Sequence, residues 1–396
     1  MFTKNKSTTL MIFLFFSFST ITITGNYLPV YFRDIGLPTS QIGLLLAVGP
    51  LAAILTQPLW GFMSDRWRST KKTLIVCIAG AIAVSIALFQ VQSFIAFVVV
   101  MFLFFCFLSP INPLAESLAL KTATEEGRTF GSIRMWGAFG FGLTALISGY
   151  IFAVIGIQNI LYPFLFFGFF TFLISLKISD IKTTSKKQVT LMDAVKLGAD
   201  AKIMGFLLLV MFISVTHRTN DNYLGIHIVQ LGGKESLIGL ATFIGIMVEV
   251  IVLATSWLWF RKFHEFFFIG LSGLIYALRW FLMSVITTPE MILFLQLFHG
   301  VAFGLFYLAA FQYVTKILPK ELQATGHVFF ITIVFGLSGM IGSLAGGSII
   351  ENFDSFVLYR VLGYSALIGS TSIFLYYIIL ANQEDKVVSN PSSIGS

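Results

Sequence analysis

The feature that most constrains the fold is a series of apolar runs of about 20 residues, the length at which a helix spans the hydrocarbon core of a bilayer. Twelve such runs follow one another along the chain of 396 residues. Inside a bilayer, backbone polar groups must be satisfied within the spanning structure, which favours helices. The sequence therefore predicts an all-α membrane protein with twelve transmembrane helices, at about 9–32, 40–62, 73–92, 94–120, 129–154, 160–178, 203–228, 237–260, 265–287, 290–315, 325–349 and 356–380.

Composition supports a membrane protein, because 57% of the residues are hydrophobic and only 11% are charged. The first run does not resemble a cleavable signal peptide, since it is long, lacks a small-x-small cleavage site and continues to Phe32. Cys77 and Cys106 both lie inside apolar runs. We expect them to be packing residues, and we expect no disulfide, metal site or cofactor.

The positions of lysine and arginine predict the orientation in the membrane. Nineteen of the 25 basic residues fall on the side of Lys4 and Lys6, and only Arg33, Lys234 and Arg360 fall on the other side. Both termini are therefore expected in the cytoplasm. This topology accounts for the net charge of +7, so no nucleic-acid partner is needed.

The chain contains an internal repeat. Residues 26–45, NYLPVYFRDIGLPTSQIGLL, match residues 222–241, NYLGIHIVQLGGKESLIGLA, at eight of twenty positions without a gap. Six runs separate the two stretches, so the two halves have the same orientation, as in transporters built from parallel repeats. We expect a six-helix bundle at 1–178, a cytoplasmic linker at 179–201, a second six-helix bundle at 202–380 and a cytoplasmic tail at 381–396.

The loop after the second run, GFMSDRWRSTKK, resembles the signature of the major facilitator superfamily, Gly-x-x-x-Asp-Arg-x-Gly-Arg-Arg/Lys. Gly61, Asp65 and Arg66 match it, whereas Arg68 and Ser69 stand where glycine and arginine are usual. An acid at such a helix junction can pair with a neighbouring helix N-terminus or arginine and hold one end of a cavity shut. We assign the three matching residues to gating; the alternative is an ordinary basic loop.

Two further segments resemble one branch of the superfamily. AESLAL and GSIRMWGAFGFG are similar to the lactose permease branch and its phenylpropionate and nucleoside symporter relatives. Residues 295–327 resemble the phenylpropionate-permease type, around a histidine and the loop LPKELQATG. The resemblance implies a solute that is an aromatic monocarboxylate, a nucleoside or a sugar.

Charges inside a membrane cost about 2.5–3.5 kcal/mol each on insertion scales, so each one suggests a function. Six lie well inside the runs: Glu116, Arg134, Arg218, Asp221, Glu249 and Arg279. Glu116 lies five residues from Lys121, and Arg134 lies six residues from Arg128. At 1.5 Å per residue their depths agree, which predicts a salt bridge. The resemblance implies that this pair recognises substrate; the alternative is a purely structural pair.

A second group of titratable residues comes from four successive runs at similar depth: Asp221, Glu249, Arg279 and His299. The resemblance assigns such a group to proton coupling. Ala302, however, stands where lactose permease carries a glutamate, so the proton acceptor would be Glu249, Asp221 or His299, with Glu249 favoured. His217 and Arg218 lie one turn before Asp221, so local pairing without a coupling role is an alternative.

Uncharged polar residues complete the candidate site. Runs 1, 4, 7 and 10 line the central cavity in the superfamily, which implies four further substrate contacts: Asn26, Asn112, Asn222 and Gln296. Aromatic residues make up 16% of the chain, too many to single out a binding platform.

These observations predict a secondary active transporter that couples protons to uptake of a small organic solute by alternating access. The chain lacks a Gly-x-x-x-x-Gly-Lys-Ser/Thr loop and the common hydrolase motifs, so ATP-driven transport and enzymatic catalysis are not expected. An exporter of the same fold is an alternative, although Arg134 favours an anionic or hydroxylated solute; a membrane sensor is a more remote one. We expect a monomer in a bacterial plasma membrane.

Overall fold

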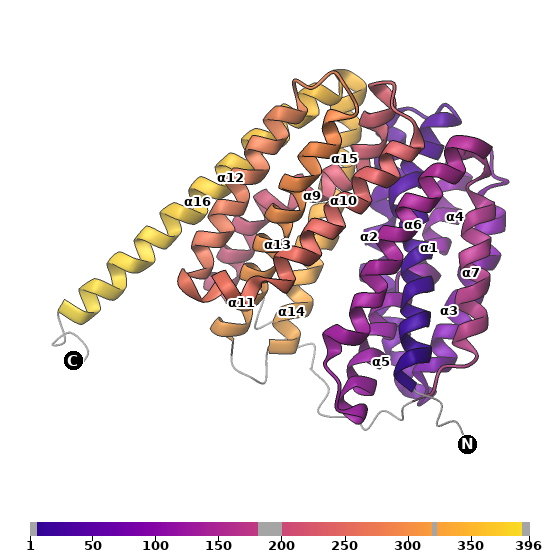
Figure 1. Ribbon diagram of the computed structural model, residues 1–396, viewed down its shortest axis with the longest axis horizontal. Helices are drawn as coiled ribbons and strands as arrows, with labels where there is room; N and C mark the ends of the chain where they lie inside the picture. Colours follow the sequence, from indigo (N-terminus) through magenta and orange to yellow (C-terminus); the bar gives the residue numbers. More distant parts are fainter. Residues whose placement is uncertain (1–5, 181–199, 319–322, 390–396) are drawn as a thin grey trace.

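The computed structural model describes residues 6–180, 200–318 and 323–389, and nearly all of these residues are helical (Figure 1). Within these ranges, twelve helical segments are long and apolar enough to cross a membrane, which confirms the predicted runs with small changes at their ends. Residues 181–199 of the expected linker and 390–396 of the expected tail lie outside the described residues. The remainder of the tail continues the last helix to Ser389.

The α-helices are α1 (Lys6–Asp34), α2 (Thr39–Arg66), α3 (Thr70–Leu88), α4 (Phe94–Leu108), α5 (Ile111–Glu126), α6 (Phe130–Ile155), α7 (Leu161–Ser175), α9 (Ala201–Gln230), α10 (Glu235–Ala254), α11 (Ser256–Trp259), α12 (Glu265–Met283), α13 (Met291–Ile317), α14 (Gln323–Ile331), α15 (Ser338–Asn352) and α16 (Ser355–Ser389).

Two of the membrane spans are interrupted. The fourth breaks into α4 and α5 at Ser109 and Pro110, where proline lacks the N–H that a continuous helix needs. The eleventh contains a π-helical turn, Thr332–Leu337, between α14 and α15, although no proline lies in this span. Such turns are often found at functional sites, and this one lies beside α9 and α2.

The two halves pack in the same way, as the repeat predicts. α1 packs on α6 in the first half and α9 packs on α15 in the second, while α6 meets α10 and α2 meets α15 across the halves (Figure 1). The repeated tyrosines make equivalent bonds: the Tyr27 hydroxyl donates to the Ala145 carbonyl at 2.6 Å, and that of Tyr223 to the Ser343 carbonyl at 2.5 Å.

Glycines allow close contact at both junctions between the halves. A Cβ atom at residue 239 of α10 would lie against the Ala145 carbonyl and 2.8 Å from the Tyr27 hydroxyl. A Cβ atom at Gly43 of α2 would lie against the corresponding carbonyl of α15. Because adding even one methyl group to such a contact costs about 1–3 kcal/mol, these two glycines control how closely the halves approach.

We therefore predict that Gly239→Ala separates the halves at this end. A free-energy shift of about 1.4 kcal/mol changes a population tenfold. Val30 is 3% exposed and faces Gly225 of the other half. The variant Val30→Cys, in a protein in which Cys77 and Cys106 have been replaced, therefore reports whether the halves separate. Labelling by an impermeant maleimide is expected to rise by about tenfold with Gly239→Ala.

Gly25→Ala is the matched control, because a Cβ atom at Gly25 of α1 would meet nothing within 4 Å. Unchanged labelling of Val30→Cys in Gly239→Ala would contradict the contact described.

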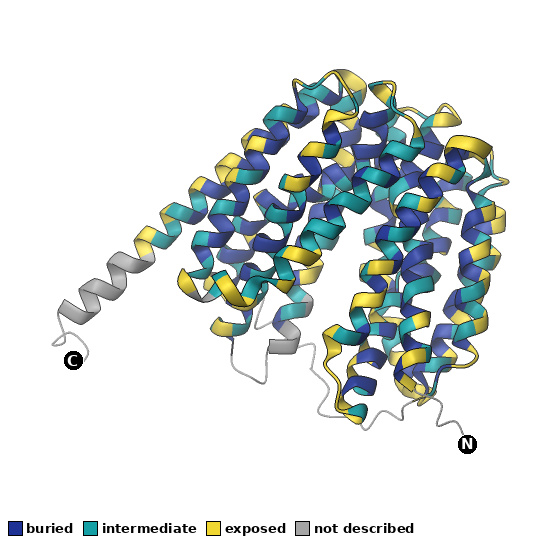
Figure 2. Ribbon diagram, viewed as in Figure 1, coloured by how far each residue is buried: buried dark blue, intermediate teal, exposed yellow. Residues whose placement is uncertain are grey.

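Many large apolar side chains are exposed, and Figure 2 shows exposed residues along the outer helices of the bundle. Ile95 and Val154 are 77% and 85% exposed, and Tyr162 and Phe294 are similarly open. Apolar surface of this extent is expected where lipid, rather than water, surrounds a protein.

Polar contacts also join the halves at the end of the bundle where α1 finishes, which we call the far side. The Arg33 guanidinium donates to the Ile226 carbonyl at 2.6 Å, near the end of α9. The Glu351 carboxylate of α15 accepts from the Ser40 amide at 2.7 Å. Pro38, the N-cap of α2, supplies no side-chain acceptor, so Glu351 satisfies this helix end from the other half. At the opposite end, the terminus side, the halves diverge (Figure 1).

The predicted gating motif lies on the terminus side. Asp65 and Arg66 are exposed, and among the described residues neither forms an ion pair. The acid at the α3 N-terminus is instead Asp180, which accepts hydrogen bonds from the Ser69 hydroxyl and, at 3.3 Å, from the Lys71 amide. Asp180 belongs to the expected linker and not to the motif. It makes the contact with a helix N-terminus that we expected of Asp65.

The backbone conformation at Arg68 explains why glycine is usual at this position of the superfamily signature. Its φ angle is +50°, in the left-handed region, where a side chain costs about 1–2 kcal/mol. We predict that Arg68→Gly stabilises the protein by about 1 kcal/mol, measured as thermal unfolding in detergent. Arg66→Gly removes the same charge from a helical residue and should destabilise it by about 1 kcal/mol. A lower melting temperature for Arg68→Gly would show that the side chain makes compensating contacts.

Candidate functional site

Glu116 and Arg134 form the predicted ion pair. The Arg134 Nε lies 2.5 Å from the Glu116 Oε1, which joins α5 to α6 and confirms the expected salt bridge. The guanidinium also lies over the Phe18 ring of α1, 4.3 Å from its centroid. Both charged side chains keep about a third of their surface exposed, 32% and 36%, although they lie well inside membrane spans. Neither side chain is therefore fully enclosed by protein.

Glu249 faces this pair from the second half. It lies on α10 and, among the described residues, it forms no ion pair. The charges that act on it most strongly are those of Arg134 and Asp221. The Tyr307 hydroxyl of α13 lies within electrostatic range of Glu116, Arg134 and Glu249. Two helices of each half thus direct polar groups toward one junction.

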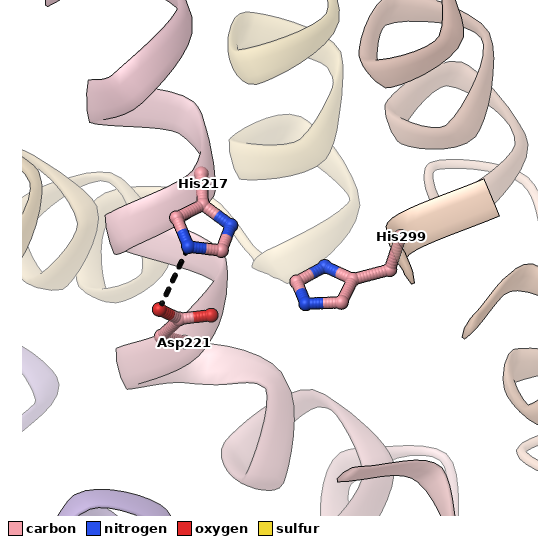
Figure 3. A group of neighbouring side chains, drawn as sticks. All are labelled: His217, Asp221 and His299. Carbon is pink, nitrogen blue, oxygen red and sulfur yellow. Dashed lines mark ion pairs between the residues drawn. The ribbon is translucent and has the colours of Figure 1, made fainter. Parts of the chain in front are cut away.

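A second cluster surrounds Asp221 on α9. Its carboxylate lies 2.8 Å from the Arg218 guanidinium and 3.4 Å from the His217 Nε2 (Figure 3). The other ring nitrogen of His217 lies 3.1 Å from the Tyr276 hydroxyl of α12. His217 and Arg218 lie one turn before Asp221 on the same helix. These contacts are therefore the local pairing that the sequence left open as an alternative. A hydrogen bond thus joins Tyr276 to His217, and the other ring nitrogen of His217 is within ion-pair distance of Asp221.

Arg279 is fully buried on α12, beside this cluster. It donates to the Leu295 carbonyl at 3.1 Å, to the Gln296 Oε1 at 3.3 Å and to the His299 Nδ1 at 3.2 Å. Its guanidinium lies 4.3 Å from the Trp280 ring centroid. Since Arg279 can only donate, His299 must accept through Nδ1, and its Nε2 then carries the proton when the ring is neutral.

His217, Asp221 and His299 place ligating atoms within 4.8 Å of one another (Figure 3). A metal ion would need an unprotonated Nε2 on His299, whereas the bond from Arg279 places the proton there. Arg218 also already neutralises Asp221. Both contacts argue against a metal centre at this cluster.

The uncharged candidates fall into two groups. Asn222 donates to the Ser343 hydroxyl at 2.7 Å, so its amide joins α9 to α15. Asn26, Asn112 and Gln296 each have one buried polar atom without a hydrogen-bond partner among the described residues. Unsatisfied buried polar atoms call for a partner, and a polar solute can supply one.

Sequence reasoning did not assign a role to Tyr276. His217 was considered as a local partner of Asp221, and Tyr307 as one of the polar residues of the tenth run that could contact the cavity, but not as part of a series of rings that recurs every four residues from His299 to Phe311. Contact between His217 and Tyr276 depends on how α9 and α12 pack, which one sequence does not reveal.

A sequence profile of the MFS_1-like family matches residues 7–361. The chain belongs to this family, within the major facilitator superfamily. Among its relatives are the uncharacterized transporter YwbF of Bacillus subtilis, 29% identical over 87% of this chain and 88% of that one, and a maltose permease of Geobacillus stearothermophilus, 24% identical over 96% and 95%. A probable 3-phenylpropionic acid transporter of Escherichia coli is 25% identical over 89% and 93%.

The fold matches that of solved transporters. The crystal structure of the nucleoside transporter NupG superposes with a TM-score of 0.84 over 94% of this chain and 99% of that one, at 16% identity. This MFS chain is therefore a multi-pass membrane transporter with the two-bundle fold, and it is not an enzyme.

Proposed function

We propose that this MFS protein is a proton-coupled symporter that takes up a small carboxylate bearing an aromatic ring. The observation that carries the proposal is the junction between the halves, where the Glu116–Arg134 pair of one half faces Glu249 of the other. An arginine fork is suited to a carboxylate, and an acid near it can exchange a proton.

The orientation follows from the distribution of basic residues, which places the terminus side in the cytoplasm. The two six-helix bundles, 1–178 and 202–380, would then be in contact on the outside and apart on the inside, an inward-facing state. Rocking of one bundle against the other would break the contacts of Arg33 and Glu351 and expose the same site to the outside. One chain contains the whole site, so a monomer in the plasma membrane suffices.

Charge balance links the proton to the solute. While Glu249 is ionised, Arg134 is attracted to two carboxylates, one on each half. When Glu249 takes a proton, the positive charge of Arg134 becomes available to the carboxylate of the solute. Proton and anion therefore bind best together, which is the coupling that a symporter requires.

A sugar is the second candidate solute. A carboxylate–guanidinium pair can also bind hydroxyl groups, and the maltose permease matches nearly the whole chain. Glu116 would accept hydroxyl hydrogen bonds, and Arg134 would donate them.

Uptake into proteoliposomes distinguishes these solutes. Radiolabelled 3-phenylpropionate, uridine and maltose are offered to vesicles containing the protein, with protein-free vesicles to subtract passive entry of the acid. The proposal expects saturable uptake of the acid and none of maltose. Saturable uptake of maltose alone would overturn the acid in favour of a sugar.

A further inference from the structure

Helix α13 carries a column of rings along one face, which we call the ring column: His299, Phe303, Tyr307 and Phe311. They recur every four residues, so successive rings lie one turn apart. Their centroids are separated by 6.4, 5.7 and 5.8 Å, and the planes of successive rings differ by 5°, 18° and 34°. The column is therefore a continuous, nearly parallel aromatic wall along the helix.

The ring column is not part of the buried core of α13. Phe306 and Tyr313 on the same helix are 1% and 4% exposed, whereas the rings of the column are all half-buried. The lipid-facing side is different again, since Phe294 is 64% exposed. The column lies between these faces, and the Tyr307 hydroxyl is within range of Glu116 and Arg134 across the junction.

Two rings of the ring column, on either side of Tyr307, are covered by histidine rings. His217 stacks on Phe303 with centroids 4.4 Å apart and planes 20° apart. His327 stacks on Phe311 at 3.8 Å and 16°. Tyr307, between them, meets the described rings outside the column only at steeper angles, 45° to Phe330 and 61° to Phe335. The middle of the wall is thus bounded by stacked rings on both sides.

We propose that the Tyr307 ring, which lies between the two covered rings, forms the surface on which the planar ring of the solute stacks, and so selects aromatic over saturated rings. This inference rests on the proposed function, because Arg134 is taken to hold the solute carboxylate. The Tyr307 hydroxyl is within electrostatic range of Arg134 across the junction, so one solute can reach both groups. A flat ring joined to a carboxylate by a short chain matches this pair of features.

A matched pair of acids tests the proposal: 3-phenylpropionate and 3-cyclohexylpropionate share the carboxylate and chain but differ in ring planarity. Uptake is measured in proteoliposomes, with passive entry into protein-free vesicles subtracted. Wild-type protein is expected to prefer the planar acid in kcat/KM by roughly three- to tenfold, the size of a stacking contact. Tyr307→Leu is expected to bring this ratio near one by raising KM for the planar acid alone.

Tyr307→Phe keeps the ring and should keep the preference, and Phe294→Leu, on the lipid-facing side of the same helix, should leave both acids unchanged. Equal uptake of the two acids by wild-type protein, or a preference that survives in Tyr307→Leu, would overturn Tyr307 as a selective surface. No carrier-mediated uptake of either acid would overturn the proposed function and this inference with it.

Discussion

Arg134→Ala is expected to lower the uptake rate by about tenfold to a hundredfold. Loss of a hydrogen bond to a charged group costs about 1.5–3 kcal/mol. The variant loses the group that we propose binds the solute carboxylate, and it leaves Glu116 without its partner at 2.5 Å inside the membrane. The initial rate of labelled 3-phenylpropionate uptake in proteoliposomes measures the effect.

Two controls separate binding from folding. Arg134→Lys keeps the charge but loses the fork, and should retain part of the activity with a raised KM. The double variant Glu116→Gln/Arg134→Gln removes both charges, so it should recover the thermal stability lost in Arg134→Ala without recovering transport. If Arg134→Ala transports normally, the pair has a structural role only.

Glu249→Gln is expected to abolish solute accumulation driven by a proton gradient. Glutamine keeps the shape and polarity of a protonated glutamate but cannot release the proton. The loaded carrier can therefore still change conformation, whereas release of the proton inside is blocked. Gradient-driven uptake should fall to the level of protein-free vesicles, while exchange of labelled for unlabelled solute continues.

Asp221→Asn provides the comparison for this result. Asp221 is paired with Arg218 and His217 on its own helix, so its loss should lower stability and reduce exchange and net uptake together. If Asp221→Asn, and not Glu249→Gln, lost gradient-driven uptake while solute exchange continued, the proton would be carried at Asp221 rather than at Glu249.

The sequence was most informative about features that depend on distance along one helix. Apolar runs predicted the spans, and counting residues from the membrane edge predicted that Glu116 and Arg134 meet, because each residue advances a helix by a fixed rise. The repeat aligns Tyr27 with Tyr223, and the structure gives these two tyrosines equivalent bonds.

The features that the sequence did not predict depend on rotation and packing of helices. The hydrogen bond between Tyr276 and His217 requires two helices to face each other at one register. The π-helical turn Thr332–Leu337 has no proline to signal it. The motif of Asp65 suggested which loop matters, but not that Asp180 would occupy the neighbouring helix N-terminus.

The most direct test of the central claim, that solute and proton cross together through Glu249, is solute-dependent acidification inside proteoliposomes loaded with a pH dye. Addition of 3-phenylpropionate to wild-type vesicles should acidify the interior faster than in protein-free vesicles. Glu249→Gln vesicles, whose solute exchange is intact, should acidify only at the protein-free rate. Acidification at the wild-type rate in Glu249→Gln would contradict the account, because the proton would then cross without this carboxyl group.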